Sequence, residues 1–369
     1  RRVITEALDR MVYGHDWTPD GEKLWIWFED AGSQVLATVD ADDGDLERHL
    51  DGPQVVDAFD VGRDGALALR LRTPERPGEI YHYGDELRAL TAVNEAVLGG
   101  LELGATEKIA FEAEDGWPVE AMVIKPPGYR DGVRYPVVVD LHGGPVAQRT
   151  WGFAFDVQLW AAQGYLVVQP NFRGSSGYGF EHTNAIWRDW GGPDTLDTIA
   201  AAEAVVERGW GDPERMAVTG WSYGGILTNH VITKTDRFAA AITGASATLY
   251  VVNYGHDMYV SWWENELGVP WEPEARARYE RVSPFNRVTE VTTPTLIIGG
   301  EKDWNVPIIN SEQLFMALKR LGVTTELVVY PGEFHVFSTP SYNKDLYERI
   351  LAWFGKYLTG GKESPDAGS

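Results

Sequence analysis

Two different patterns of apolar and polar residues divide the chain. The first hundred residues carry short runs rich in β-branched and aromatic residues between turns, which is typical of β-strands. The strands predicted there are Leu24–Phe28, Val35–Val39, Val55–Phe59, Ala66–Leu71 and Glu79–Tyr83. From about Ile109, apolar runs of strand length alternate with helical stretches, which indicates a mostly parallel sheet with helices on both faces.

The strand-rich part contains a repeat. The turns Asp20-Gly21 and Asp64-Gly65 precede similar strands and lie 44 residues apart, close to the ~40–50-residue period of β-propeller blades. A propeller needs about four blades or more to close. We therefore interpret residues 1–105 as a propeller-like remnant and expect it to be truncated at its N-terminus. The chain opens with Arg1-Arg2 and no initiator methionine, which leaves the true start and any signal peptide open.

Residues 106–360 predict an α/β domain, and the polar tail 361–369 is predicted to be disordered. The strands expected in the α/β domain are Tyr135–Leu141, Leu166–Pro170, Met216–Thr219, Ala239–Thr243, Thr295–Ile298 and Glu326–Tyr330. Its expected helices are Phe153–Gln163, Thr195–Arg208, Gly224–Lys234, Ile309–Leu321 and Lys344–Tyr357.

Composition narrows the function classes. The 369 residues are 44% apolar and 24% charged, as in ordinary globular proteins, and the net charge is −23. A field of that sign repels phosphate backbones and anionic lipids, so we expect neither nucleic acid nor a membrane as partner. The chain has no cysteine and no H-e-x-x-H pattern, so no metal or cofactor is implied. The lack of cysteine favours a cytoplasmic location for the protein. The sequence leaves open whether the protein forms homo-oligomers.

Residues Gly220–Gly224 (GWSYG) fit the G-x-S-x-G nucleophile elbow. The motif requires a strand before it and a helix after it, and the apolar run MAVT and a helix-forming stretch stand in those places. Glycines flank the serine because the turn is strained and leaves no room for side chains. Ser222 is therefore the candidate nucleophile.

An elbow serine needs a histidine as base and a carboxylate to orient it, in the chain order Ser, Asp, His. Asp303 follows the strand TLIIGG, and His335 follows the strand ELVVY. Among the eight histidines, only His335 meets both the order and the placement. Asp257 is the rival acid, but it ends no predicted strand.

The tetrahedral oxyanion needs two fixed donors, whose removal costs ~3–4 kcal/mol each. One predicted donor is the backbone N–H of Tyr223, the residue after the nucleophile. The second is expected in the loop after the third strand of the fold, where YPVVVDL runs into His142-Gly143-Gly144-Pro145. A glycine turn that merely leaves the sheet is the alternative interpretation of this loop.

Five ordered motifs resemble the catalytic domain of the prolyl oligopeptidase family of serine peptidases. They are HGGP (142–145), NFRGSSGYG (171–179), GWGDPERMAVTGWSYGG (209–225), GEKDWNVP (300–307) and YPGEFHVF (330–337). The resemblance implies an α/β-hydrolase fold behind a β-propeller that restricts access to short peptides. It also implies a triad of Ser222, Asp303 and His335, with oxyanion donors at the amides of Tyr223 and Gly144.

The branch of the family stays open at this point. The HGGP loop resembles the acylaminoacyl peptidases, whereas Asp303-Trp304-Asn305-Val306 resembles the dipeptidyl peptidases. The resemblance implies that Asn305 and Val306 bind substrate, with Tyr250 and Tyr254 in the stretch that lines the first specificity pocket. Plain core packing is the alternative interpretation of these aromatic residues. The expected function is a serine peptidase of one of these exopeptidase types, with a carboxylesterase on the same fold as the alternative.

Overall fold

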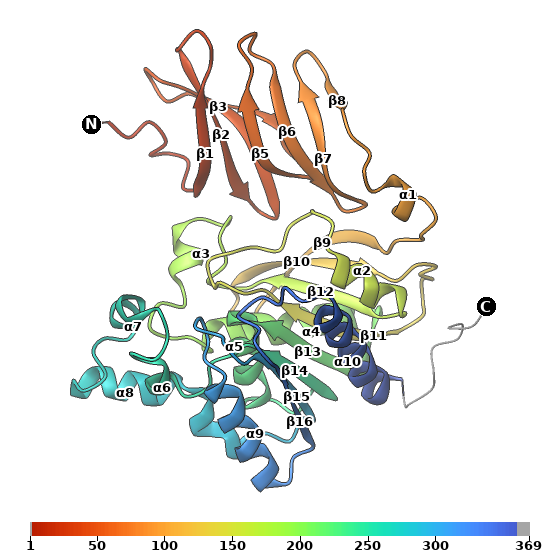
Figure 1. Ribbon diagram of the computed structural model, residues 1–369, viewed down its shortest axis with the longest axis vertical. Coiled ribbons are helices and arrows are strands. Elements are labelled where there is room, and N and C mark those ends of the chain that lie inside the picture. The colour runs from red at the N-terminus through yellow and green to blue at the C-terminus, as the bar shows by residue number, and fades with distance from the viewer. Residues whose placement is uncertain (1, 360–369) are drawn as a thin grey trace.

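Figure 1 shows the computed structural model of the protein, which describes residues 2–359. Within these residues, two eight-stranded sheets follow one another along the chain. The tail 361–369, which the sequence predicts to be disordered, lies outside the described residues. No helix in the described part is both long and apolar enough to cross a lipid bilayer.

Two antiparallel meanders of four strands each form the first sheet. The first meander comprises β1 (Val12–Trp17), β2 (Lys23–Asp30), β3 (Ser33–Asp40) and β4 (Leu46–Leu50). The second comprises β5 (Val55–Val61), β6 (Leu67–Thr73), β7 (Arg76–Tyr83) and β8 (Leu87–Ala89). Each strand pairs with the next within its meander, and β3 and β5 join the two meanders in parallel at Gln34 and Val55.

The two meanders repeat with the spacing that the sequence indicates. β2 and β6 begin 44 residues apart, each just after its Asp-Gly turn. Gly21 and Gly65 in these turns have φ of +74° and +86°, a conformation that glycine adopts without steric cost. The five predicted strands are confirmed as β2, β3, β5, β6 and β7. The pattern misses β1, β4 and β8: β1 and β8 are exposed on both faces and β4 is short with mainly charged residues at its centre, so none has a clear apolar face.

The second sheet has the strand order β16-β15-β14-β13-β11-β12-β10-β9. Its strands are β9 (Ala105–Glu112), β10 (Pro118–Lys125), β11 (Tyr135–Leu141), β12 (Leu166–Asn171), β13 (Gly211–Trp221), β14 (Ala240–Gly244), β15 (Thr295–Gly300) and β16 (Thr325–Tyr330). The strands from β11 to β16 are parallel, as the sequence predicts. β9 and β10, which the pattern misses, form an antiparallel pair at one edge.

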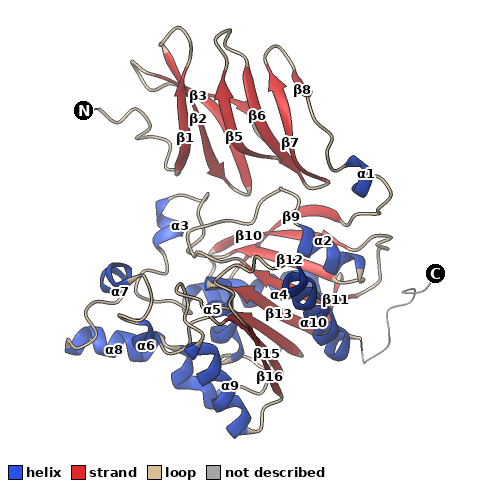
Figure 2. Ribbon diagram, in the orientation of Figure 1, coloured by secondary structure: helices blue, strands red, loops and turns tan. Residues whose placement is uncertain are grey.

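Figure 2 shows α1 (Glu95–Leu98) in the link between the two sheets, whereas the other helices flank the second sheet or belong to the connections at its carboxyl edge. These other helices are α2 (Phe155–Ala162), α3 (Phe180–Asn184), α4 (Pro193–Glu207), α5 (Tyr223–Ile232), α6 (Tyr250–Asn253), α7 (Val260–Glu266), α8 (Pro273–Val282), a 3₁₀ helix (Pro284–Glu290), α9 (Ile309–Leu321) and α10 (Pro340–Leu358). The five predicted helices are confirmed as α2, α4, α5, α9 and α10, with each end within four residues of its expected place.

The parallel strands are buried on both faces. Val137 and Val139 of β11 pack in a core with residues of α4, α5 and α9, whereas Val138 packs in a second core with α2 and α10. Successive side chains of a strand point to opposite faces, so the unbroken apolar run of β11 requires cover on both sides. This is the α/β-hydrolase fold that the sequence predicts, preceded by a β-rich segment.

The first sheet contacts the second unit through the turn between β2 and β3. The N–H of Gly32 donates to Oε1 of Gln148 (2.8 Å), and its carbonyl accepts from the N–H of Trp151 (2.9 Å). Nε2 of Gln148 donates to the carbonyl of Ser33 (2.9 Å). Gly32 has φ of +86°, and a Cβ there would lie 2.2 Å from Cε of Met122. The Met122 methyl group can move, but the positive φ strains any residue with a side chain, so the turn favours glycine.

Candidate active site

Ser222 occupies the sharp turn between β13 and α5. Its φ and ψ are +59° and −123°, a region that residues with a side chain rarely adopt. Hydrogen bonds hold the turn in place: the N–H of Ser222 donates to the carbonyl of Gly244 in β14, and its carbonyl accepts from the N–H of Ile226, both at 2.9 Å. The serine thus lies at the carboxyl end of the central strands, where the elbow motif predicts it.

Close packing of backbones around Ser222 excludes side chains at the neighbouring glycines. A Cβ on Gly220 would lie 2.3 Å from the carbonyl carbon of Gly224, and one on Gly224 would lie 2.1 Å from the carbonyl oxygen of Leu141. A Cβ on Gly225 would lie 2.6 Å from the carbonyl oxygen of Gly244. These approaches are far closer than van der Waals contact, so the elbow requires glycine at all three positions.

Asp303 and His335 come from the loops after β15 and β16 and are hydrogen bonded to each other. Nδ1 of His335 lies 2.7 Å from Oδ2 of Asp303. The other carboxylate oxygen accepts the backbone N–H groups of Asn305 (2.8 Å) and Val306 (2.9 Å). Asp303 is buried and His335 is partly exposed. Because a carboxylate can only accept, Nδ1 carries the proton and Nε2 is left to act as the base.

The rival acid Asp257 has a different role. Its carboxylate accepts from the indole N–H of Trp263 (2.6 Å) and from the backbone N–H of Tyr259 (2.8 Å). It therefore fixes the segment that carries these aromatic residues and does not orient the histidine.

The loop that carries His335 is held from both sides. Nε1 of Trp221, next to the elbow serine, donates to the carbonyl of His335 (2.9 Å). The Glu333 carboxylate accepts the N–H groups of Ser338 (2.8 Å) and Thr339 (3.1 Å) at the start of α10. Hydrogen bonds from Thr339 and Ser338 lower the pKa of Glu333. Among residues 2–359, Ser222 and His335 themselves share no hydrogen bond, and such catalytic contacts often form only with substrate.

The HGGP loop lies directly against the serine. A Cβ on Gly143 would lie 3.4 Å from Cβ of Ser222 and 3.9 Å from its Oγ. Gly144 has φ of +127° and lines the same cavity as Ser222 and Tyr223. The two residues whose amides are the expected oxyanion donors therefore border one cavity beside the serine.

This cavity has a volume of about 480 Å³ and is mostly apolar. Its lining residues are Gly144, Pro145, Val146, Ser222, Tyr223, Ile226, Ala247, Asn253, Tyr259, Trp262, Trp263, Asn305 and Val306. None of these described residues carries a charged side chain. Asn305 and Val306, two of the four residues expected to bind substrate, are therefore at the cavity.

Tyr250 and Tyr254, the other two, lie outside the cavity lining. Tyr250 is fully buried, its ring packs on Trp263 at 5.5 Å, and its hydroxyl is 2.8 Å from Nε2 of His230. The hydroxyl of Tyr254 donates to Glu264 (2.6 Å). Aromatic residues follow each other closely in this stretch, and the sequence could not show which of them α6 and α7 turn toward the serine.

Asn305 is oriented by a neighbouring tyrosine. The hydroxyl of Tyr259 donates to Oδ1 of Asn305 at 2.6 Å. The carbonyl oxygen of the side-chain amide is thereby occupied, and its NH₂ group is the part that can donate to a ligand.

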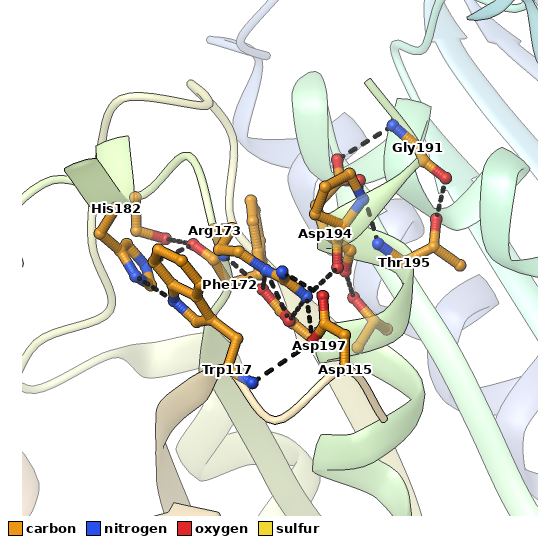
Figure 3. Close-up of polar contacts among 12 residues, drawn as sticks. Asp115, Trp117, Phe172, Arg173, His182, Gly191, Asp194, Thr195 and Asp197 are labelled. Atoms are coloured by element: carbon orange, nitrogen blue, oxygen red, sulfur yellow. Dashed lines mark hydrogen bonds and ion pairs between the residues drawn. The ribbon is translucent and has the colours of Figure 1, made fainter. Parts of the chain in front are cut away.

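Figure 3 shows a buried ion pair between Arg173 and Asp197. Arg173, in the motif after β12, donates through Nε (3.0 Å) and Nη2 (2.7 Å) to Asp197 of α4. Its Nη1 and Nη2 also donate to Asp115, at 2.5 and 3.1 Å. Arg173 and Asp197 are almost completely removed from solvent. Buried charges persist only when they are paired in this way, so the cluster fixes β12 relative to α4.

Phe172 connects this ion pair to the oxyanion region. Its ring stacks on His142 of the HGGP loop with centroids 4.2 Å apart, and on Tyr223 at 6.1 Å. Burial lowers the pKa of His142 to about 3, so its ring is neutral. Nε2 of His142 is hydrogen bonded to Oγ of Ser175 (2.8 Å).

Asp194 anchors the side chain of Tyr223. The tyrosine hydroxyl donates to Oδ2 of Asp194 at 2.7 Å, and the N–H of Gly191 donates to the same oxygen at 3.2 Å. Asp194 is fully buried in α4, and this burial raises its pKa to about 6. The carboxyl group thus holds the ring of Tyr223, the residue that follows Ser222.

Sequence reasoning misses the supporting residues Arg173, Asp194, Asp197 and Glu333. Arg173 is a charged residue at the end of an apolar strand, which is a detectable signal. Asp194 and Asp197 are three residues apart and so share a face of α4. The pattern could not show that this face is the buried one.

A serine at a strained strand-to-helix elbow and a hydrogen-bonded histidine–aspartate pair in the loops after the following strands are typical of serine hydrolases with the α/β-hydrolase fold. The sequence profile of the Prolyl oligopeptidase family matches residues 151–361, more than half of the chain. The protein belongs to this family.

Individual relatives extend the similarity over almost the whole chain. The protein is 32% identical to "Uncharacterized peptidase YuxL" of Bacillus subtilis (strain 168), over 93% of this chain and 53% of the relative. It is 28% identical to dipeptidyl-peptidase 5 of Porphyromonas gingivalis, over 97% of this chain and 54% of the relative. It is similar in structure to Pyrococcus horikoshii acylaminoacyl peptidase, with a TM-score of 0.88 and 25% sequence identity. The match covers 100% of this chain and 59% of the peptidase chain. The chain thus spans about half the length of the curated relatives it matches.

Gly224→Ala should destabilise the protein and lower its rate of fluorophosphonate labelling. The new Cβ would lie 2.1 Å from the carbonyl oxygen of Leu141, and such overpacking costs ~1–3 kcal/mol. Gly355→Ala is the control, because a Cβ at that position in α10 has nothing within 4 Å. It should stabilise the helix by ~0.5–1 kcal/mol. Urea unfolding checks both, and equal stabilities of the two variants would contradict the close packing at the elbow.

Asp194 should make the stability depend on pH. Because burial raises its pKa from 3.8 to about 6, the folded protein keeps this proton at pH values where the unfolded chain has lost it. Relative to Asp194→Asn, the wild type should lose on the order of 1–3 kcal/mol as the pH rises from about 4 through 6. Urea unfolding across this range measures the difference, with Asp131→Asn at an exposed site as control. A difference that stays constant with pH would be the contrary result.

Proposed function

We propose that the protein is a serine peptidase that hydrolyses short peptides through an acyl-enzyme intermediate. Ser222 is the nucleophile, His335 is its base and Asp303 holds the imidazole in the required tautomer. The observation that carries the proposal is the strained elbow serine in the same site as the 2.7 Å hydrogen bond between His335 and Asp303. Membership of the prolyl oligopeptidase family supports it.

In the proposed reaction, Nε2 of His335 takes the proton of Ser222 as Oγ attacks the peptide carbonyl. The imidazolium is stabilised by the Asp303 carboxylate and then gives its proton to the leaving amine. A water molecule, deprotonated by the same histidine, hydrolyses the acyl-enzyme and releases Ser222. The backbone amides of Tyr223 and Gly144 stabilise the oxyanion in both halves of the reaction.

We propose an exopeptidase of the dipeptidyl or acylaminoacyl type. A dipeptidyl-peptidase 5 and an acylaminoacyl peptidase are among the proteins to which this chain is similar, which supports both types. Asn305, at the cavity, is proposed to donate from its NH₂ group to a carbonyl of the bound peptide. A carboxylesterase with the same triad is the second candidate, and the apolar, uncharged cavity favours it equally.

The first sheet is proposed to be part of a β-propeller, with residues 1–105 forming blades and residues 106–360 the catalytic domain. Its two four-stranded meanders, 44 residues apart, have the size and connectivity of propeller blades. Such a cover would restrict the site to short peptides. A cytoplasmic location is proposed on the lack of cysteine alone.

Ser222→Ala should abolish hydrolysis of both a peptide p-nitroanilide and p-nitrophenyl acetate, by at least about 10³-fold, because the nucleophile is lost. The variant should fold normally and lose labelling by a fluorophosphonate. Ser341→Ala, at an exposed position of α10, should keep both activities. Persistent labelling of the first variant would contradict the assignment. A wild type that cleaves the ester and no peptide would favour the carboxylesterase.

Asn305→Ala should lower kcat/KM for an aminoacyl-dipeptide p-nitroanilide by about fivefold, since a neutral hydrogen bond contributes ~1 kcal/mol. Hydrolysis of p-nitrophenyl acetate should change little, because a small ester does not reach this side chain. Tyr259→Phe, which removes the hydroxyl that orients Asn305, should show a weaker effect in the same direction. Equal losses on peptide and ester would instead mean that Asn305 only supports the loop of Asp303.

A further inference from the structure

Asn253 carries a hydrogen-bond donor that no group in the described part of the chain uses. It lies at the end of α6, is only 1% exposed and lines the cavity beside Ser222. Its Nδ2 is buried and has no hydrogen-bond partner within residues 2–359. An unpaired buried amide is unfavourable, and Asn253 is one of the residues of the cavity wall.

Hydrogen bonds of the neighbouring Asn310 fix the orientation of the Asn253 amide. Oδ1 of Asn310 accepts the backbone N–H of Thr248 (3.2 Å), so its other side-chain atom must be the NH₂ group. That group donates to the carbonyl of Pro307 (3.0 Å) and to Oδ1 of Asn253 (2.7 Å). Because the Asn253 atom facing Asn310 has to be an acceptor, the atom left over is the donor.

The remaining cavity wall defines what this donor can bind. Ile226, Ala247, Trp262 and Val306 give an apolar surface with an aromatic side. No lysine or arginine lines the cavity to pair with an anionic group, and no aspartate or glutamate to pair with a cationic one. A charged side chain would therefore be buried unpaired, which is costly. The cavity suits an uncharged, largely apolar side chain that carries a hydrogen-bond acceptor.

We propose that Asn253 determines specificity for the acyl residue, the residue whose carbonyl Ser222 attacks. Its NH₂ group donates to an acceptor at the end of the acyl side chain, so tyrosine, with an aromatic body and a hydroxyl oxygen, is selected over phenylalanine. This inference rests on the proposed function, because it places the acyl residue in the cavity next to the nucleophile. Beyond the proposed function, the inference assigns to the Asn253 amide the discrimination between tyrosine and phenylalanine, which have almost the same shape.

The test compares N-acetyl-tyrosine and N-acetyl-phenylalanine p-nitrophenyl esters on the same protein. The wild type should favour the tyrosine ester about tenfold in kcat/KM, the size expected for one neutral hydrogen bond. Asn253→Leu, which replaces the amide by an apolar group of similar volume, should reduce this preference to about onefold. The ratio of the two rates does not depend on how much protein is folded, so a merely structural role of Asn253 would leave it unchanged.

Ile226→Val is the matched control, because it alters the same cavity wall and leaves the donor in place. It should change both rates together and keep the preference for tyrosine. If Asn253→Leu no longer reacts with a fluorophosphonate, Asn253→Ala, which also removes the donor and needs no additional space, decides the matter.

Two results would overturn the inference: equal rates for the two esters in the wild type, or a tyrosine preference that survives the loss of Asn253. The esters also separate this inference from the proposed function. A protein that cleaves esters and no peptide would fail as a peptidase, while its preference between the two esters would still decide the role of Asn253.

Discussion

The close approach of three backbone segments at Ser222 is the constraint on which the site depends. Leu141 at the end of β11, Gly224 at the start of α5 and Gly244 at the end of β14 meet there with no side chains between them. In the sheet, Leu141 pairs with Gly220 and Trp221 pairs with Gly244, so the parallel register determines where the elbow lies. The positive φ of Ser222 is maintained because the strands on both sides over-determine it. The oxyanion loop begins at the next residue after Leu141, so the nucleophile and its donors share one backbone framework.

Burial sets the protonation states behind this framework. His142 is kept neutral, and its ring stacks on Phe172 without a charge that would need a counter-ion. The burial of the Asp197 carboxylate is compensated by Arg173, which donates several hydrogen bonds to it. In a protein with a net charge of −23, a buried carboxylate without such a partner would add to an already unfavourable potential. The positive charge of Arg173 therefore offsets the burial of the Asp197 carboxylate.

The sequence predicts those parts of the molecule in which a local pattern has a single structural solution. Buried parallel strands such as β11 are continuous apolar runs, and the elbow motif forces a serine to one edge of the sheet. The position of Ser222 at that edge, and of Asp303 and His335 in the loops after β15 and β16, could therefore be predicted from order and placement. The edge strands β1 and β8 have no buried face and leave no pattern. Tyr250 could not be separated from Tyr259 because both lie in one aromatic stretch, and only the path of α6 and α7 decides which ring reaches the cavity. The role of Asn253 depends on Asn310, 57 residues further along, and no local pattern reveals such a pair.

The contact between the β2–β3 turn and Gln148 has a consequence for how the two parts of the chain can vary. Gln148 lies four residues after Gly144, so the hydrogen bonds of Gly32 and Ser33 attach the first sheet to the segment that presents an oxyanion donor. The first sheet is thus hydrogen bonded to the segment that follows the HGGP loop, so it cannot be exchanged without affecting that segment. A chimera that combined this catalytic domain with the β-rich segment of a relative would need a glycine at position 32 and a matching partner for Gln148. The turn and the loop should therefore be inherited together, as one evolutionary unit spanning two sheets.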